Sequence, residues 1–221
     1  MKKKYTLFLA AVLLSFMGFS QTVTLPITEN FDSEPNQVSC SATGNTLVSN
    51  NFSNAAGDTD EWDPDDNGTS STNTGPSGDH TSGNGKYLYT ETSGCNNTTA
   101  NLESVLMNWT GHNVVQVDAW YHMFGTAQGT MHFDVKQGAG AWQLDYIPSW
   151  TDNQDLWQLR SIVICDTNLL KDSVQVRFRA QTGTSFSSDM AIDDISIFGV
   201  SCVAPGSLTT SNLNPSISID L

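Results

Sequence analysis

Apolar and polar residues alternate along this chain with a period of two, and helical periodicity is almost absent. The clearest segments are 174–180, which reads VQVRFRA, 131–136, which reads MHFDVK, and 115–123, which reads VQVDAWYHM. Successive side chains of a strand point to opposite faces of a sheet. Each segment therefore predicts a strand with one buried face and one face in water.

Turn signals separate these segments from further candidate strands. Glycine-rich turns occur at 125–129, 138–140 and 183–184. The remaining strands are predicted at 22–31, 86–91, 102–107, 141–147, 156–165 and 191–198. Many short strands with such turns predict an all-β fold, an antiparallel jelly-roll β-sandwich. The polar region 45–85 is predicted to form long loops over it.

The first twenty residues have the pattern of an export signal. Lysines at 2–4 precede an apolar run at 5–19, and Gly18 and Ser20 are small residues before a cleavage point at Gln21. Because no later apolar run reaches about eighteen residues, we expect no transmembrane segment in the mature chain. The predicted location is secreted or at the cell surface.

The charge of the chain is strongly acidic. Without the three leader lysines, six basic residues remain against 23 acidic ones, a net charge near −17. Such a chain repels phosphate backbones and anionic membranes, which argues against a nucleic-acid partner. Extracellular proteins, glycans and divalent cations remain as candidate partners.

Four cysteines are widely spaced, at Cys40, Cys95, Cys165 and Cys202. In an exported chain they predict two disulfides. Three connectivities are possible, and we favour Cys40–Cys95 with Cys165–Cys202, which would join loops at each end of the domain. The alternative is buried free thiols. No C-x-x-C motif occurs, which argues against a zinc or redox site.

Several separated segments together resemble a MAM domain, the extracellular module named for meprin, A5 antigen and receptor tyrosine phosphatase mu. In order along the chain they read GPSGDHTSGNGKYLYTETS, YHMFGTAQGTMHFDV, SWTDNQDLWQLRSIVI and MAIDDISIF, with Phe31–Asp32 and Glu61–Trp62 before them. The resemblance covers about Phe31 to Cys202 and implies a jelly-roll fold. The family carries cysteines beside its first strand that this chain lacks, whereas its late cysteine pair matches Cys165 and Cys202.

The residues after 202 resemble a different module. The segment SCVAPGSLTTSNLNPSISIDL is similar to the opening strands of a fibronectin type III repeat, without the tryptophan that should follow. We therefore expect a signal peptide at 1–20, a MAM-like domain at 21–202 and a linker with an incomplete repeat at 203–221. The leader and tail resemble those of secreted multidomain proteins of Bacteroidetes.

An Asp–His pair, Asp79–His80, lies in a glycine-rich loop before the strand at 86–91. The resemblance implies that this loop packs near both ends of the domain, which would bring Asp32, Asp79, Asp193 and Asp194 together. Gathered carboxylates repel one another unless a cation or protons neutralise them. We therefore expect a structural Ca²⁺ at these residues. Alternatively, these aspartates accept backbone N–H groups in turns.

A second acidic run spans residues 58–68. Its residues Asp63, Asp65, Asn67 and Gly68 match the first half of an EF-hand loop. Thr74 stands where the bidentate glutamate should be, and no helices are predicted to flank the run. A solvated loop is therefore favoured over a calcium loop.

The histidines offer little evidence of catalysis. His80 could act as a general base beside Asp79, but no G-x-S-x-G or H-E-x-x-H signature supplies its partners. His122 and His132 are expected on neighbouring strands, where they could meet and bind a transition metal or simply be surface imidazoles. His112 lies in a turn and carries no signal.

Aromatic residues are concentrated between residues 142 and 157. Exposed Trp142 and Trp150 could stack on sugar rings, which makes them weak candidates for carbohydrate binding. Trp157 matches a core tryptophan of the family. Arg177 and Arg179 share the polar side of one strand and are expected to form ordinary surface ion pairs.

The resemblance implies a non-catalytic adhesion or recognition module, homophilic in some family members. The alternatives are an accessory domain of a secreted peptidase whose catalytic part is absent from this chain, or a calcium-stabilised carbohydrate-binding module.

Overall fold

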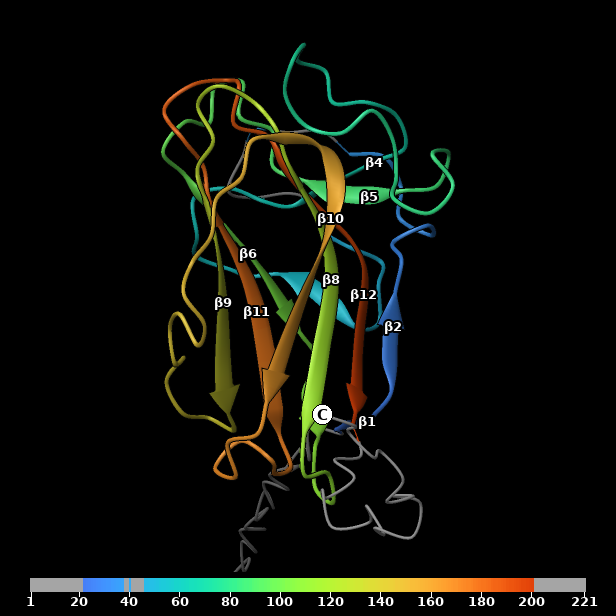
Figure 1. The fold of residues 1–221 in the computed structure, drawn as a ribbon, viewed down its shortest axis with the longest axis vertical. Helices are drawn as coiled ribbons and strands as arrows, with labels where there is room; N and C mark the ends of the chain where they lie inside the picture. Colours follow the sequence, from blue (N-terminus) through green and yellow to red (C-terminus); the bar gives the residue numbers. More distant parts are fainter. Residues whose placement is uncertain (1–21, 38–39, 41–45, 201–221) are drawn as a thin grey trace, which may run out of the picture.

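The computed structural model describes residues 22–37, 40 and 46–200. Their twelve strands form two six-stranded sheets, and the described residues contain no helix. Figure 1 shows the long strands running side by side, with connecting loops gathered at the two ends. The predicted antiparallel all-β sandwich is confirmed.

The first sheet is built around its central strand, β11, which pairs with β9, β6 and β7. The pair β1–β7 is parallel, and the other pairs are antiparallel. Its strands are β1 (Val23–Thr24), β3 (Phe52–Asn54), β6 (Thr99–Ser104), β7 (Met107–Asn108), β9 (Thr130–Gln137) and β11 (Val174–Gln181).

The second sheet is built around β8 and β12, and all of its pairs are antiparallel. Its order is β10-β8-β12-β5-β4, and β2 also pairs with β12. Its strands are β2 (Ile27–Glu29), β4 (Asp63–Asp65), β5 (Tyr87–Tyr89), β8 (Val115–Met123), β10 (Gln154–Ile164) and β12 (Met190–Gly199).

The apolar faces of the two sheets pack against each other as the alternation predicts. Val115 and Val117 of β8 and Val176 and Phe178 of β11 are fully buried members of one core. The intervening side chains of both strands are less buried. The core therefore consists of one face of each sheet.

Three predicted strands differ from the observed ones. The segment 22–31 divides into β1 and β2 around Pro26, which has no backbone N–H to donate to a ladder. The segment 102–107 divides into the end of β6 and β7. The predicted strand 141–147 runs beside β9, but its backbone pairs with β9 only at the isolated bridge Val135–Gln143 and through a bond from Tyr146 N to Phe133 O of 2.9 Å.

The prediction of a solvated loop at residues 58–68 is wrong for residues 60–65, which are buried, whereas Thr59, Asn67 and Gly68 are exposed. Trp62 is completely buried, and Asp60, Glu61 and Asp63 are at most 6% exposed. Asn54 anchors the segment, because its side-chain oxygen accepts Trp62 N at 2.9 Å and its amide donates to Trp62 O at 3.0 Å. Because Trp62 is buried, the acidic residues next to it are buried as well. The segment continues into β4, which pairs with β5.

Replacing Trp62 by alanine should destabilise the domain by about 3–5 kcal/mol, because a large cavity would remain in the core. Urea unfolding followed by tryptophan fluorescence and circular dichroism measures this difference. The matched control is Leu144→Ala, since Leu144 is 57% exposed. It should change the free energy of unfolding by no more than about 0.5 kcal/mol. Equal effects of both changes would contradict the assigned burial.

Candidate functional site

The loop 79–86 joins three aspartates that lie far apart in sequence. Its backbone N–H groups donate to Asp32 at 2.9 Å, to Asp79 at 2.8 Å and to Asp193 at 3.0 Å. At Gly85 a side chain would clash with the carboxylates of both Asp32 and Asp79. We call Asp32, Asp79, Asp193 and Asp194 the aspartate cluster. The expected convergence of the chain's start, this loop and the last strand is thus observed.

The carboxyl groups of the aspartate cluster differ in their electrostatic environment. Asp193 is 1% exposed, and burial, with the nearby charges of Asp194 and Asp79, raises its pKa to about 8. Burial also opposes ionisation of Asp79, but N–H bonds from Ser82 and Gly85 outweigh it and lower the pKa of that carboxyl. Within the cluster, Asp79 therefore favours its ionised form, whereas Asp193 favours its protonated form.

His80 pairs with Asp194 and not with Asp79. Its Nδ1 lies 2.7 Å from Asp194 Oδ2, and its ring stacks on Trp120 with centroids 3.7 Å apart. The hydroxyl of Thr81 donates to the same Asp194 oxygen. The arrangement in which Asp79 would orient His80 as a general base, which the sequence left as a weak possibility, is therefore not formed. The bond to Asp194 holds the loop to β12, and the stacking on Trp120 holds it to β8.

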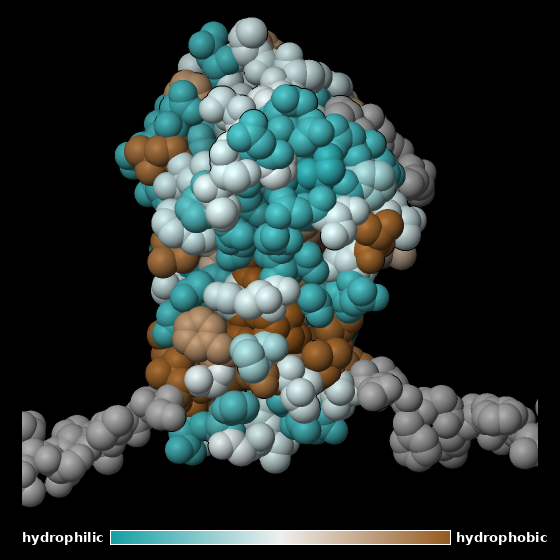
Figure 2. All heavy atoms as spheres, turned by 90° about the vertical axis from the view of Figure 1, so that its right-hand side faces the viewer, coloured by the Kyte–Doolittle hydropathy of each residue, from teal (hydrophilic) through white to brown (hydrophobic). Residues whose placement is uncertain are grey.

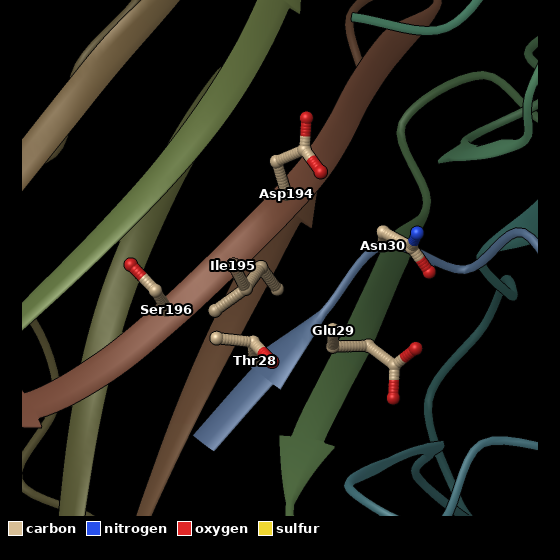
Figure 3. A pocket seen from close by; sticks show the side chains of 6 residues that line it. All are labelled: Thr28, Glu29, Asn30, Asp194, Ile195 and Ser196. Atoms are coloured by element: carbon tan, nitrogen blue, oxygen red, sulfur yellow. The ribbon is translucent and has the colours of Figure 1, made fainter. Parts of the chain in front are cut away.

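A cavity of about 440 Å³ adjoins the aspartate cluster between β2 and β12. Figure 3 shows its two carboxyl groups, Glu29 and Asp194, pointing away from each other. The Glu29 carboxylate also accepts from Phe31 N at 3.2 Å and from the Ser49 hydroxyl at 2.5 Å. The cavity is lined by Thr28, Glu29, Asn30, Asp194, Ile195 and Ser196. Since both acids are engaged, this cavity offers hydroxyl and amide groups and no acid–base pair.

The aspartate cluster meets only some of the needs of a calcium site. Among the described residues, no three or more His, Cys, Asp or Glu side chains are grouped so that they could hold a metal ion. The backbone N–H bonds to Asp32, Asp79 and Asp193 match the alternative interpretation as turn-capping residues. Each carboxylate oxygen of Asp32 and Asp193 accepts one hydrogen bond and keeps a second lone pair, whereas Asp194 Oδ2 already accepts from His80 and Thr81. The electrostatics of Asp193 favour a cation, whereas the ligand geometry is incomplete.

The loop that carries Asp79 and His80 covers a second, smaller core. Tyr87, Tyr89 and Ala191 are completely buried there, and Trp157 packs against them. The indole N–H of Trp157 donates to Gly78 O at 3.1 Å. Trp157 is therefore a packing residue, as expected, and it links β10 to the loop.

The two tryptophans considered for sugar stacking already have partners. The ammonium of Lys136 and the guanidinium of Arg177 each lie 4.4 Å from the ring centre of Trp142. Trp150 packs against the main core and has Arg160 at 4.9 Å from its ring. A sugar on Trp142 or Trp150 would have to replace these contacts.

Arg177 and Arg179 form ion pairs as expected, but with a buried acid. Asp134 is 0% exposed, and its Oδ2 lies 2.7 Å from Arg177 Nη2 and 3.0 Å from Arg179 Nε. Burial opposes ionisation of Asp134, but the hydrogen bonds from both arginines and from Asp145 N lower its pKa. These arginines stabilise the outer face of the first sheet.

The expectation that His122 and His132 occupy neighbouring strands is wrong. His122 lies on β8 of the second sheet and His132 on β9 of the first, because the chain crosses between sheets at residues 124–129. His122 Nε2 lies 3.3 Å from Asp155, and His132 Nδ1 lies 2.5 Å from Asp145. The two imidazoles do not share a site.

One predicted disulfide is confirmed and the other lies partly outside the described residues. Cys40 and Cys95 are bridged, with Cα atoms 5.4 Å apart. Cys165 is exposed and has no partner among residues 22–37, 40 and 46–200. Cys202 lies outside those ranges, so its bridge to Cys165 stays a prediction.

The predicted signal peptide at 1–20 and the predicted repeat-like tail at 203–221 also lie outside the described residues. In the part of the chain that is described, no helix is long and apolar enough to cross a membrane.

Sequence reasoning missed the polar residues that line the cavity beside the aspartate cluster. Thr28, Asn30 and Ser196 give no motif, because β2 and β12 are far apart in the sequence and meet only by pairing. In the sequence, the only pattern close to this cavity was the acidic pair Asp193–Asp194.

The two antiparallel sheets, the Cys40–Cys95 disulfide and the carboxylates that accept loop N–H groups are typical of an extracellular β-sandwich domain. The family model described as "MAM domain, meprin/A5/mu" matches residues 31–203. The chain belongs to the MAM domain family, whose members are extracellular binding modules.

One curated protein and two solved structures are similar to this chain. Neuropilin-1a of Danio rerio is 30% identical over 140 residues, which are 62% of this chain and 15% of that protein. The K2 cleaved adhesin domain of Lys-gingipain superposes with a TM-score of 0.52 at 17% identity, covering 78% of this chain and 99% of that chain. The CBM22-2 xylan-binding domain of Paenibacillus barcinonensis Xyn10C has a TM-score of 0.48 at 11% identity, covering 79% and 99%. The adhesin-domain likeness confirms the fold.

The raised pKa of Asp193 makes stability depend on pH. The folded state favours its protonated form, so the stability that this proton contributes at low pH is lost as pH rises toward 8. The pKa values of Asp60, Asp189 and Glu61 are also raised, to about 6, 6 and 7. The loss of stability at the highest pH values is therefore assigned to Asp193. With chelator present, we expect the free energy of unfolding to fall between about pH 7 and 8 by about 1 kcal/mol.

Urea unfolding at several pH values checks this expectation. Asp193→Asn should flatten the curve above about pH 7, because the amide does not titrate. The control Asp172→Asn changes an exposed carboxylate that caps only Ser173 N. An unchanged slope in Asp193→Asn would show that another group causes the decline.

Proposed function

We propose that this chain is a non-catalytic adhesion or recognition module of a secreted or cell-surface multidomain protein. The observation that carries the proposal is the MAM match over residues 31–203, which coincides with the sandwich. The side chains of the candidate site support it, since His80 and Asp79 hold loops in place. Export would use the signal at residues 1–20, and the partner would be an extracellular protein or a glycan.

The exposed strand β10 is the surface best suited to contact with a second copy. Among the described strands it pairs only with β8. Leu156, Leu159 and Val163 are 48%, 47% and 56% exposed on it. Its only charged residues are Asp155 and Arg160, of opposite sign, in a chain of net charge −14. Two copies could therefore approach at β10 with little repulsion and extend the sheet.

Self-association tests this homophilic contact. The purified chain should sediment faster as its concentration rises, and beads coated with it should aggregate. Leu159→Asp combined with Val163→Asp should abolish both effects, because the new charges face each other across the contact. Leu144→Asp is the control, since Leu144 is equally exposed but lies outside β10.

A chain that stays monomeric and does not aggregate beads would rule out homophilic adhesion. Hydrolysis of casein or a polysaccharide by the same preparation, free of contaminating activity, would overturn the non-catalytic assignment. An accessory domain of a secreted peptidase would show neither activity nor self-association, and would need the rest of its parent protein.

A second candidate function is a calcium-stabilised carbohydrate-binding module. The observation that favours it is the buried carboxyl of Asp193 beside Asp194 and Asp79. A hard cation there would favour the ionised form of Asp193 and offset the repulsion. We propose Asp32, Asp79, Asp193 and Asp194 as its carboxylate ligands.

Calcium titration tests this site. Isothermal calorimetry at about pH 8 should show Ca²⁺ uptake with proton release, and Ca²⁺ should raise the melting temperature by several degrees. Asp193→Asn should remove both effects, whereas Asp172→Asn should not. If Ca²⁺ gives no heat and no thermal shift at a pH where Asp193 is ionised, these aspartates only cap the loop.

A further inference from the structure

A second cavity, of about 250 Å³, lies at the loop end of the sandwich and is separate from the aspartate cluster. One wall is the turn 68–77, which precedes the loop that carries His80. The other walls are Phe124, next to the end of β8, and Asp155, near the start of β10. We call this cavity the loop pocket.

The walls of the loop pocket are held by hydrogen bonds. Thr69 N donates to Pro76 O at 3.3 Å and closes the turn. Gly75 N donates to Phe124 O at 3.1 Å and fixes the turn to β8. Gly75 has φ of +64°, and any side chain there would lie 2.5 Å from the methyl group of Thr69. The pocket is therefore formed before any ligand arrives.

The polar groups of the loop pocket are mostly neutral. Among the described residues, the side chains of Asn73 and Ser77 make no hydrogen bond, so their amide and hydroxyl groups are available to a ligand. Asp155 contributes the only charge to the lining, and its side chain is 64% exposed. Phe124 adds a half-buried aromatic ring. Hydroxyl, amide and carboxylate groups beside one aromatic face suit a ligand with many hydroxyl groups and an apolar face.

A buried histidine positions the carboxylate of the loop pocket. The His122 side chain is 2% exposed, and its Nε2 lies 3.3 Å from Asp155 Oδ1. Burial lowers the pKa of His122, and the nearby Asp155 carboxylate opposes that shift. The Nδ1 atom is buried without a partner among the described residues. Trp157 packs 5.6 Å from the ring and restricts its movement.

The lining excludes charged ligands. Asp155 repels phosphates and carboxylates, and no Lys or Arg lines the pocket to bind them. A cation would find a single carboxylate that His122 already shares. The volume suits one ring and is too small for a chain of sugars.

We propose that the loop pocket binds one neutral hexopyranose unit of a glycan, with its hydroxyl groups on Asp155, Asn73 and Ser77 and its C–H face on Phe124. This inference rests on the proposed function as a binding module and names the ligand class of one site. It also places sugar recognition away from Trp142 and Trp150, whose rings are occupied by other side chains.

Saturation-transfer NMR with the full chain tests the pocket. The probes are the methyl glycosides of glucose, galactose and mannose, each added separately. At least one should receive saturation at its ring C–H protons, and calorimetry then gives its affinity. Phe124→Leu and Asp155→Ala should each weaken that affinity by about tenfold or more.

Matched controls separate pocket effects from general ones. Phe186→Leu changes an aromatic side chain that is 51% exposed at the same end but does not line the pocket, so its affinity should be unchanged. If Phe124→Leu unfolds, the double variant Asn73→Ala, Ser77→Ala removes two surface groups and should also weaken binding. Thermal unfolding shows which variants are folded.

Two results would overturn the inference. In one, none of the three glycosides receives saturation. In the other, a glycoside binds, but Phe124→Leu, Asp155→Ala and the double variant leave its affinity unchanged. Bead aggregation by Phe124→Leu, which leaves β10 intact, is measured separately without sugar. If aggregation persists while sugar binding is absent, the pocket inference fails and the adhesion proposal stands.

Discussion

The hydrogen bonds between the loop 79–86 and the aspartate cluster are the constraint on which the rest of this structure depends. The outer face of the second sheet carries Tyr87, Tyr89 and Trp157, which need cover from water. The loop provides that cover only because carboxylates from β12 and from the start of the domain accept its backbone N–H groups. The bonds also tie the two ends of the domain together.

The same bonds explain how so acidic a chain can bury acids. Asp134 is stabilised by two arginines, and its pKa is lowered although it is completely buried. Asp193 has backbone donors, but burial and, after it, the neighbouring carboxylates of Asp194 and Asp79 raise its pKa. Few basic residues are available, so backbone N–H groups replace them at most buried acids. At Asp193, where these groups do not suffice, the raised pKa favours the protonated carboxyl.

Potential contact surfaces lie on three separate parts of one scaffold. The strand β10 offers an apolar edge of low charge, the aspartate cluster offers carboxylates, and the loop pocket offers hydroxyl and amide groups. Figure 2 shows hydrophilic side chains covering the upper part of one face, with apolar ones exposed below. Such a division suits a module whose loops recognise ligands while its strands form the framework. The MAM family match identifies the module, whereas its ligand depends on these sites.

The sequence by itself determined the long strands and the sandwich, because alternation with a period of two reports directly which side chains are buried. It left the Cys40–Cys95 bridge as one of three possible connectivities and gave no sign of the short strands β3 and β4. Tertiary structure alone decided that β8 and β9 belong to different sheets, which separates His122 from His132. It also decided that residues 60–65 are buried around Trp62 and that Phe124 and Asp155 meet the turn 68–77. These outcomes depend on strand pairing across long stretches of chain, and a local pattern carries no information about which partner a strand will choose.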